Sequence, residues 1–286
     1  MNPSIKVVID QYGVCPSKRK GQAFLADKNI IKKIVNAASI CPTDTVIEIG
    51  AGLGLMTKMI AQKAKRVVAL EIDSHLCEVL RELLADCKNV EIIETDVLKY
   101  NFSDVVTGKK NNKIRIIGNI PYNISTPILF HLLSFRDIIK DMFIMLQREV
   151  AARITAHPGT KTYGIPSVIF STFAEIYQVC SVSPQSFYPV PKVHSSLLHI
   201  SYRYKPLYPL KNTDFFMHTI RKAFSKRRKT LLNNLSDPNL SLDPVEAIIM
   251  AGIDPQRRAE TVSAKEFAIL SNILFGLKDR KVLDNT

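Results

Sequence analysis

The sequence predicts an α/β protein with a seven-stranded, mostly parallel sheet, followed by a small all-α region. Over residues 27–156, short apolar runs alternate with helical patterns, which is typical of βαβ units and a parallel sheet. Beyond about residue 205 the strand pattern stops and only helical spacing continues. We therefore expect two domains, residues 1–204 and residues 205–286.

The first strand, expected over residues 45–49, runs straight into a glycine-rich turn. Residues 46–54 read Val-Ile-Glu-Ile-Gly-Ala-Gly-Leu-Gly. Glycine permits positive φ and lets a ligand lie against bare main chain, so Gly50 and Gly52 are candidate binding residues. A dinucleotide fingerprint, G-x-G-x-x-G, is disfavoured because its last position falls on Leu55 or Thr57. Taken alone, the stretch could also be a turn of no chemical meaning.

The other elements of the sheet region follow in order. Asp27 is placed to cap a helix that runs to residue 38. Another helix is expected to start with Ser125 or Thr126 as its cap and Pro127 in its first turn. No helix separates the last two strands, so they should form an antiparallel hairpin. Further strands are expected over residues 66–71, 90–95, 113–118, 141–147, 175–182 and 195–202, and further helices over residues 57–64, 72–84, 148–156 and 167–174.

Two acidic residues stand at the ends of predicted strands. Glu71 ends the second strand, roughly 20 residues past the glycine turn, where nucleotide-binding α/β folds place a carboxylate for the ribose hydroxyls. A carboxylate suits two O–H donors because it only accepts hydrogen bonds. Asp96 follows the third strand, where it can accept a hydrogen bond from an exocyclic adenine amine. The alternative for Glu71 is a solvated acid at a strand end.

The fourth strand delivers the turn Asn119-Ile120-Pro121-Tyr122 to its carboxyl end, where ligands bind in open α/β sheets. The exocyclic amine of adenine is a poor nucleophile until it pyramidalises, and acceptors aimed at its N–H groups favour that change. The Asn119 side-chain oxygen and the Ile120 carbonyl are the candidate acceptors. Pro121 stiffens the turn by fixing φ, and Tyr122 can stack on the purine face. The alternative is a plain turn after a strand.

Composition narrows the class of protein. The chain has 286 residues, with 39 Lys and Arg against 26 Asp and Glu, a net charge of +13. This surplus favours a polyanionic partner, either nucleic acid or an acidic membrane surface. No apolar run is long enough to span a membrane, and the N-terminus lacks the apolar segment of a secretory signal. Five scattered cysteines without a CxxC pair indicate neither a zinc site nor a disulfide framework, so a reducing cytoplasm is expected.

The predicted helical region carries a run of positive charge over residues 221–229 that contains no acidic residue. Such a run is ordinarily a solvated face or a localisation signal. In a basic chain with a base-modifying site, we favour phosphate contacts that position RNA without reading its sequence. Helices are expected here over residues 214–225, 230–235, 244–251 and 264–277. The candidate RNA-binding residues are Arg221, Lys222, Lys226, Arg227, Arg228 and Lys229.

Together these stretches resemble one family closely. The glycine turn resembles motif I of the S-adenosylmethionine-dependent methyltransferases, and nearly the whole chain resembles the small-subunit ribosomal RNA adenine N6,N6-dimethyltransferases. The resemblance implies a Rossmann-like methyltransferase fold and S-adenosylmethionine as cofactor. The methyl transfer expected at the Asn119–Tyr122 turn needs no metal. It rests on residues 20–25 (KGQAFL), 48–54 (EIGAGLG), 119–125 (NIPYNIS), 147–153 (QREVAAR), 187–195 (FYPVPKVHS) and 227–231 (RRKTL).

The resemblance also implies roles for individual residues. Ala23 stands where the family usually has Asn or His, which preserves a backbone contact but removes a side-chain contact. Phe187 is implied to stack the target adenine opposite Tyr122. Prolines at 189 and 191 would hold an extended lead-in that presents the Phe187 ring at low entropic cost, and a core aromatic is the alternative. The implied cofactor-site residues are Ala23, Leu25, Gly50, Glu71, Asp96 and Asn119.

The implied activity is dimethylation of two adjacent adenosines in a hairpin loop near the 3′ end of small-subunit ribosomal RNA, during ribosome biogenesis. A loop base costs least to extract from its stack. We expect a monomer that acts on an immature small subunit. The related large-subunit methyltransferase that confers macrolide resistance is the runner-up, and the FYPVPKV and RRKTL stretches disfavour it. The other alternative is an RNA-binding assembly or transcription factor without turnover, which the intact Glu71 and Asn119–Tyr122 turn disfavour.

Overall fold

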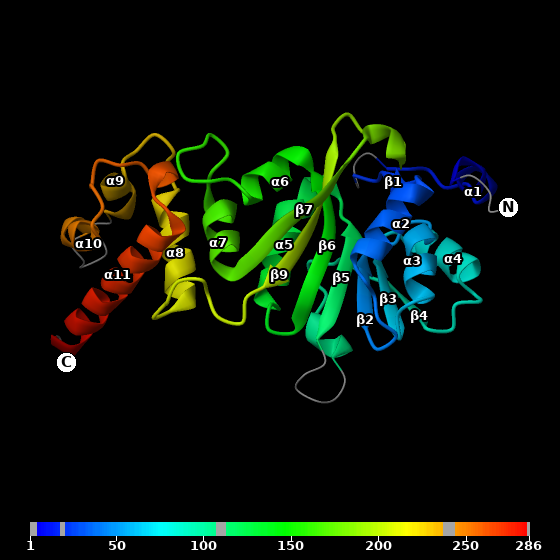
Figure 1. The fold of residues 1–286 in the computed structure, drawn as a ribbon, viewed down its shortest axis with the longest axis horizontal. Coiled ribbons are helices and arrows are strands. Elements are labelled where there is room, and N and C mark those ends of the chain that lie inside the picture. Colours follow the sequence, from blue (N-terminus) through cyan, green and yellow to red (C-terminus); the bar gives the residue numbers. More distant parts are fainter. Residues whose placement is uncertain (1–4, 18–20, 107–112, 237–243, 285–286) are drawn as a thin grey trace. The chain divides into compact units, whose positions relative to one another are not determined.

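A computed structural model gives the fold of the chain (Figure 1). The structure describes residues 5–17, 21–106, 113–236 and 244–284. Lys20, the first residue of the KGQAFL motif, lies outside the described residues.

The central sheet has seven strands in the order β4-β3-β2-β5-β6-β9-β7. The first five in this order run parallel, and β9 pairs antiparallel with β6. The two strands of this sheet that come last in the sequence, β7 and β9, are hydrogen-bonded neighbours. The predicted seven-stranded, mostly parallel α/β fold is thus confirmed. The strands are β2 (Thr45–Ile49), β3 (Arg66–Glu71), β4 (Val90–Glu94), β5 (Ile114–Asn119), β6 (Ile139–Gln147), β7 (Ala174–Val182) and β9 (Ser195–Tyr202).

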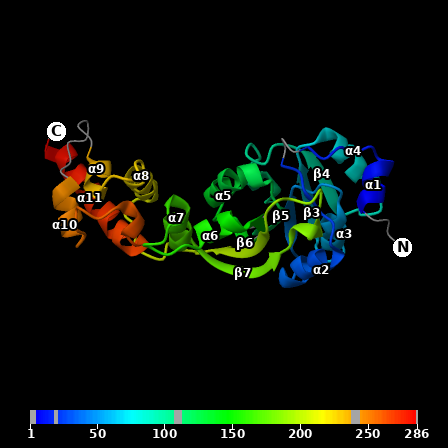
Figure 2. The same cartoon turned by 90° about the horizontal axis from the view of Figure 1, so that it is seen from above.

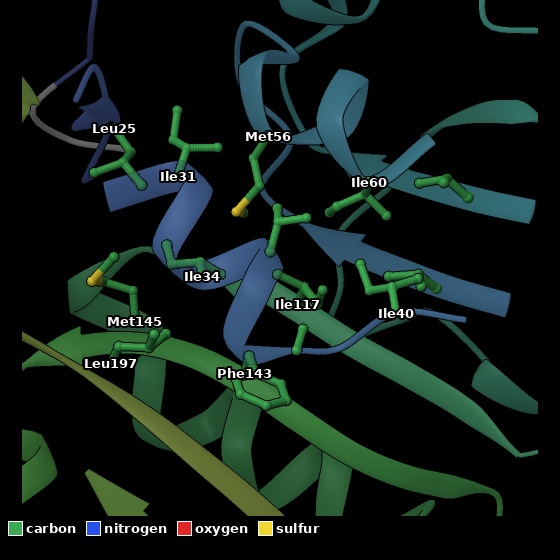
Figure 3. Close-up of a cluster of buried hydrophobic side chains, with 14 of the residues drawn as sticks. Leu25, Ile31, Ile34, Ile40, Met56, Ile60, Ile117, Phe143, Met145 and Leu197 are labelled. Carbon is green, nitrogen blue, oxygen red and sulfur yellow. The ribbon is translucent and has the colours of Figure 1, made fainter. Parts of the chain in front are cut away.

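Helices cover both faces of this sheet (Figure 2). Helices α2 (Lys28–Ala37) and α3 (Leu55–Ala61) lie on one face, and α5 (Ser125–Ser134) lies on the other. The apolar side chains of α2 recur every three to four residues, so they form one stripe that packs on the sheet. Figure 3 shows the resulting core, in which the labelled side chains of α2, α3, β5, β6 and β9 meet. They include Ile31, Ile34, Met56, Ile60, Ile117, Met145 and Leu197.

Local hydrogen bonds explain where the helices begin. Asp27 caps α2 as predicted, because its side chain accepts from the backbone N–H groups of the first turn. Asp73 caps α4 (Ser74–Leu83) in the same way. The predicted Ser125 or Thr126 cap of α5 is wrong. That helix already includes Ser125, whose hydroxyl donates back to the Tyr122 carbonyl at 3.1 Å, and its capping position has no side-chain hydrogen bond.

One short helix and two short strands were not predicted from the sequence. Helix α1 spans Ile5–Gln11, and a two-stranded sheet joins β1 (Phe24–Leu25) to β8 (Phe187–Tyr188). These strands are antiparallel, with Phe24 opposite Tyr188 and Leu25 opposite Phe187. Two-residue strands have no periodicity to detect, so only the folded chain reveals this pairing.

The chain divides into two compact units, Met1–Ala151 with Ile176–Tyr202, and Ala152–Glu175 with Arg203–Thr286. The sequence placed residues 152–175 in the first domain, whereas this division groups them with the C-terminal helices. All described regular elements beyond residue 204 are helical. The remaining helices are α6 (Arg148–Ile154), α7 (Ile165–Phe173), α8 (Thr213–Ala223), α9 (Leu231–Leu235), α10 (Pro244–Met250) and α11 (Ala264–Asp284).

Candidate active site

The glycine-rich turn follows β2 at the carboxyl edge of the sheet, and its conformation requires glycine. Gly50 and Gly52 have φ of 74° and 56°, in the left-handed region. A Cβ atom on Gly52 would lie 2.9 Å from the Phe24 ring, and one on Gly50 would lie 3.2 Å from the Asn119 carbonyl oxygen. Side chains here would therefore strain the turn and push it away from its neighbours.

Glu71 lies at the end of β3 with its carboxylate turned toward the glycine turn. One oxygen accepts from the Gly52 N–H at 3.0 Å, and the other accepts from the N–H groups of Ile72 and Asp73 at 3.0 and 3.1 Å. Burial raises the pKa of Glu71, while these three backbone donors oppose the rise. The solvated strand-end alternative is wrong, because the side chain is buried.

One pocket collects most of the predicted site residues. Asp96 borders it beyond β4 and is fixed there by accepting from the Leu98 N–H at 3.0 Å. Ile72 borders it too, and its side chain is 51% exposed. The predicted residues that line the pocket are Ala23, Gly50, Gly52, Glu71, Asp96, Asn119, Ile120, Pro121 and Tyr122.

The orientation of the Asn119 amide is set by the N-terminal segment. Asn119 Nδ2 donates to the Ala23 carbonyl oxygen at 2.8 Å. With its nitrogen committed to that bond, the amide presents its oxygen as the remaining acceptor. Ala23 thus contacts Asn119 through its backbone, and this contact does not depend on the Ala23 side chain.

Tyr122 also lines the pocket, and its hydroxyl is tied to a distant strand. The Tyr122 and Ser195 hydroxyl oxygens are 2.6 Å apart, and either can be the donor. Burial raises the pKa of Tyr122, partly offset by the bond to Ser195. The ring is therefore a neutral aromatic surface at ordinary pH.

Phe187 and Leu25 do not line this pocket. The backbone at Phe187 is extended, as predicted, but pairing of β8 with β1 packs its ring into the core at 2% exposure, so the ring is not presented at the pocket in this conformation. Its role in stacking a base stays a prediction that requires the ring to leave the core. Leu25 is buried in the same cluster and borders a smaller cavity beneath the glycine turn.

Glu48 is a buried acid next to the site, and its environment was not predicted from the sequence. Its side chain is 1% exposed, borders the smaller cavity with Gly50 and Asn119, and has one oxygen without a hydrogen-bond partner in the described chain. Burial raises the pKa of Glu48 to about 8, and the nearby Glu71 adds to the rise. The signal was an acid inside an otherwise apolar strand, where a charge is costly to bury.

The basic run lies in the second unit, over the end of α8 and the turn that follows it. Arg227 already has partners within the protein, because its guanidinium donates to the Lys161 carbonyl at 3.3 Å and lies 3.5 Å from the Glu260 carboxylate. Lys226, Arg228 and Lys229 are exposed, and none of their side chains has a hydrogen bond or ion pair with another described residue. Their charge is available to an anionic partner.

Two further observations concern the described residues only. They contain no group of three or more His, Cys, Asp or Glu side chains that could hold a metal ion. Among the described helices, none is long and apolar enough to cross a membrane.

Known proteins of similar sequence match this chain over nearly its full length. A family model described as ribosomal RNA adenine dimethylase matches residues 17–275. The ribosomal RNA small subunit methyltransferase A of Syntrophus aciditrophicus is 43% identical over 274 residues, which cover 94% of this chain and 98% of that protein. Its counterpart in Moorella thermoacetica is 41% identical over 274 residues, covering 93% and 95%.

Solved structures of ribosomal RNA and adenosine methyltransferases are also similar to this chain. A dimethyladenosine transferase from Plasmodium falciparum is 27% identical and superimposes with a TM-score of 0.74 over 90% of this chain and 98% of that one. The 23S rRNA methyltransferase ErmE is 25% identical with a TM-score of 0.64, covering 88% and 99%.

Proposed function

Because the chain belongs to the ribosomal RNA adenine dimethylase family, we propose that it dimethylates the N6 amines of two adjacent adenosines in small-subunit ribosomal RNA, using S-adenosylmethionine. The target lies in a hairpin loop near the 3′ end. Relatives at 41–43% identity are named for the small subunit, whereas the solved large-subunit enzyme is 25% identical. This difference supports the small-subunit RNA over the large-subunit RNA.

The observation that carries the proposal is the fixed amide of Asn119. Its nitrogen is bound to Ala23 and its oxygen is left as an acceptor, in the same pocket as the Glu71 carboxylate and the Tyr122 ring. An acceptor held in place before the reaction meets the charge that develops on the adenine nitrogen without reorganising. The Ile120 carbonyl is the proposed second acceptor.

The remaining pocket residues fit S-adenosylmethionine. Bound there, the cofactor supplies the methyl group on its sulfonium. Glu71 retains acceptor capacity beyond its three backbone donors and takes ribose hydroxyls, while Asp96 accepts from the adenine amine of the cofactor. Gly50 and Gly52 leave room where a Cβ would intrude, and the exposed Ile72 offers an apolar surface to the adenine ring.

Tyr122 provides the stacking surface for the target adenine, and the basic run of the second unit holds phosphates. Base–aromatic stacking contributes roughly 1–3 kcal/mol per base. The phosphate contacts position the RNA and supply most of its affinity. We further propose that the protein acts as a cytoplasmic monomer on an immature small subunit and that the reaction requires no metal.

A non-catalytic assembly factor with the same fold is the alternative, and one experiment separates the two. Purified protein is incubated with radiolabelled S-adenosylmethionine and undermethylated small subunits, and the labelled nucleotides are mapped. Label on two adjacent adenosines supports the proposal. Binding to the subunits without any methyl transfer would instead indicate an assembly factor.

A further inference from the structure

The bond between Tyr122 and Ser195 joins two segments that are 73 residues apart in the sequence. The two hydroxyl oxygens are 2.6 Å apart. Tyr122 is half-buried at the pocket, whereas Ser195 is fully buried as the first residue of β9. A short hydrogen bond between a pocket side chain and a buried side chain restrains the former.

The restraint acts on a side chain whose backbone is already fixed. Pro121 sets the preceding φ, and the Tyr122 carbonyl accepts from the Ser125 hydroxyl at 3.1 Å. What would otherwise remain free is rotation of the ring about its two side-chain torsions. The bond holds the hydroxyl oxygen in place and so fixes the first torsion, χ1. That oxygen lies on the axis of the second torsion, χ2, which is restrained only through the preference of a phenol O–H for the plane of its ring. Fixing the direction of the side chain before any base arrives lowers the ordering cost of stacking.

The other end of the bond is anchored in the central sheet. Ser195 lies opposite Gln147 in the antiparallel pairing of β9 with β6, and the Arg148 N–H donates to the His194 carbonyl at 3.0 Å. A side chain held by a paired strand is positioned more accurately than one held by a loop.

The next residue provides an internal comparison. Ser196 is equally buried, but side chains alternate along a strand and its hydroxyl has no hydrogen-bond partner among the described residues. A buried serine in β9 therefore does not necessarily have a hydrogen-bond partner, and the bond of Ser195 to Tyr122 is specific to its position.

We propose that Ser195 is a positioning residue whose hydroxyl holds the Tyr122 side chain in place for the incoming adenine. This inference rests on the proposed function, in which Tyr122 stacks the target base. Ser195 itself does not touch the RNA or the cofactor. Its effect should appear in base capture, after the subunit has docked through its phosphates.

The test is a double-mutant cycle on methyl transfer to undermethylated small subunits. Ser195→Ala and Tyr122→Phe remove the same bond from opposite ends, and each should lower the single-turnover rate at saturating subunit and cofactor by about two- to tenfold, the range for one neutral hydrogen bond. The double variant should be no slower than either single variant. Affinities for cofactor and subunit should stay unchanged, and Ser196→Ala is the matched control with wild-type rates.

Three outcomes would overturn the inference: a wild-type rate in Ser195→Ala, losses that multiply in the double variant, or an equal loss in Ser196→Ala. Thermal melts and cofactor calorimetry on each variant identify a misfolded protein, and Tyr122→Phe reports on the bond even if Ser195→Ala fails to fold. Absence of methyl transfer in the wild-type protein would contradict the proposed function instead.

Discussion

Replacing Asn119 tests the chemical step most directly. Asn119→Ala removes the acceptor that the Ala23 carbonyl holds in place through a 2.8 Å bond. Losing one preorganised partner of this kind typically lowers the rate about 10²–10³-fold, or about 2.7–4 kcal/mol of barrier. RNA affinity should hardly change, because phosphate contacts dominate it.

The geometry gives a sharper version of this test. In Asn119→Asp, an ionised carboxylate places an oxygen where Nδ2 now donates, so it repels the Ala23 carbonyl. Protonation restores a donor to Ala23 and leaves the second oxygen as an acceptor. The Asp variant should therefore gain activity as pH falls, whereas the Ala variant should not.

The assay is single-turnover methyl transfer at saturating cofactor, where binding losses are masked. Calorimetry with S-adenosylmethionine and a thermal melt control for cofactor binding and folding. Near-normal rates in Asn119→Ala would refute the acceptor role. An Asp variant that matches the Ala variant at every pH would refute the part assigned to Ala23.

Three other changes test the remaining assignments. Glu71→Ala should weaken S-adenosylmethionine binding at least tenfold by calorimetry, since charge-assisted bonds contribute roughly 1.5–3 kcal/mol each; unchanged affinity would remove Glu71 from the site. Replacing Lys226 and Arg228 with Ala should reduce the slope of log RNA affinity against log salt concentration by about one per lost phosphate contact. Arg227→Ala should reduce this slope less, because Arg227 already interacts with Lys161 and Glu260. Slopes equal to that of the wild-type protein would show that the basic run is only a solvated face. Because the pKa of Glu48 is raised to about 8, its protonated form stabilises the fold, and that contribution is full below about pH 4.5 and lost as pH rises to about 8. Glu48→Gln should remove this loss of stability, which amounts to at most about 1.4 kcal/mol per pH unit. The measurement is the free energy of unfolding in urea as a function of pH. The same pH dependence in the wild-type protein and the variant would contradict the burial of an ionisable group at this position.

The sheet was predictable because its strands and helices carry strong local periodicity. Strand β2 has the bounds that its apolar pattern predicts, and Asp27 caps α2 as its position before an apolar stripe indicates. The pocket was predictable as well, because parallel strands bring Glu71, Asp96 and Asn119 to one edge of the sheet.

What could not be predicted depends on contacts between distant segments. The Ala23–Asn119 and Tyr122–Ser195 bonds join residues 96 and 73 positions apart, and no local pattern encodes either pairing. Phe187 was misplaced for the same reason. The prolines after it indicate an extended segment, but only its pairing with Leu25 decides that the ring turns inward.

The pairing of β1 with β8 has a consequence for how the protein is made. A chain emerging from its own ribosome exposes Phe24 and Leu25 long before Phe187 and Tyr188, so the N-terminal segment waits for more than half of synthesis without its strand partner. Tyr122 likewise waits for Ser195. Contacts of such long sequence separation form late because the loop between them must close first. A nascent fragment that ends before residue 187 would contain the glycine turn and the Asn119–Tyr122 turn. It would lack both the β1–β8 pairing and the bond between Tyr122 and Ser195. We therefore expect activity only after β9, the last strand of the central sheet, has been added.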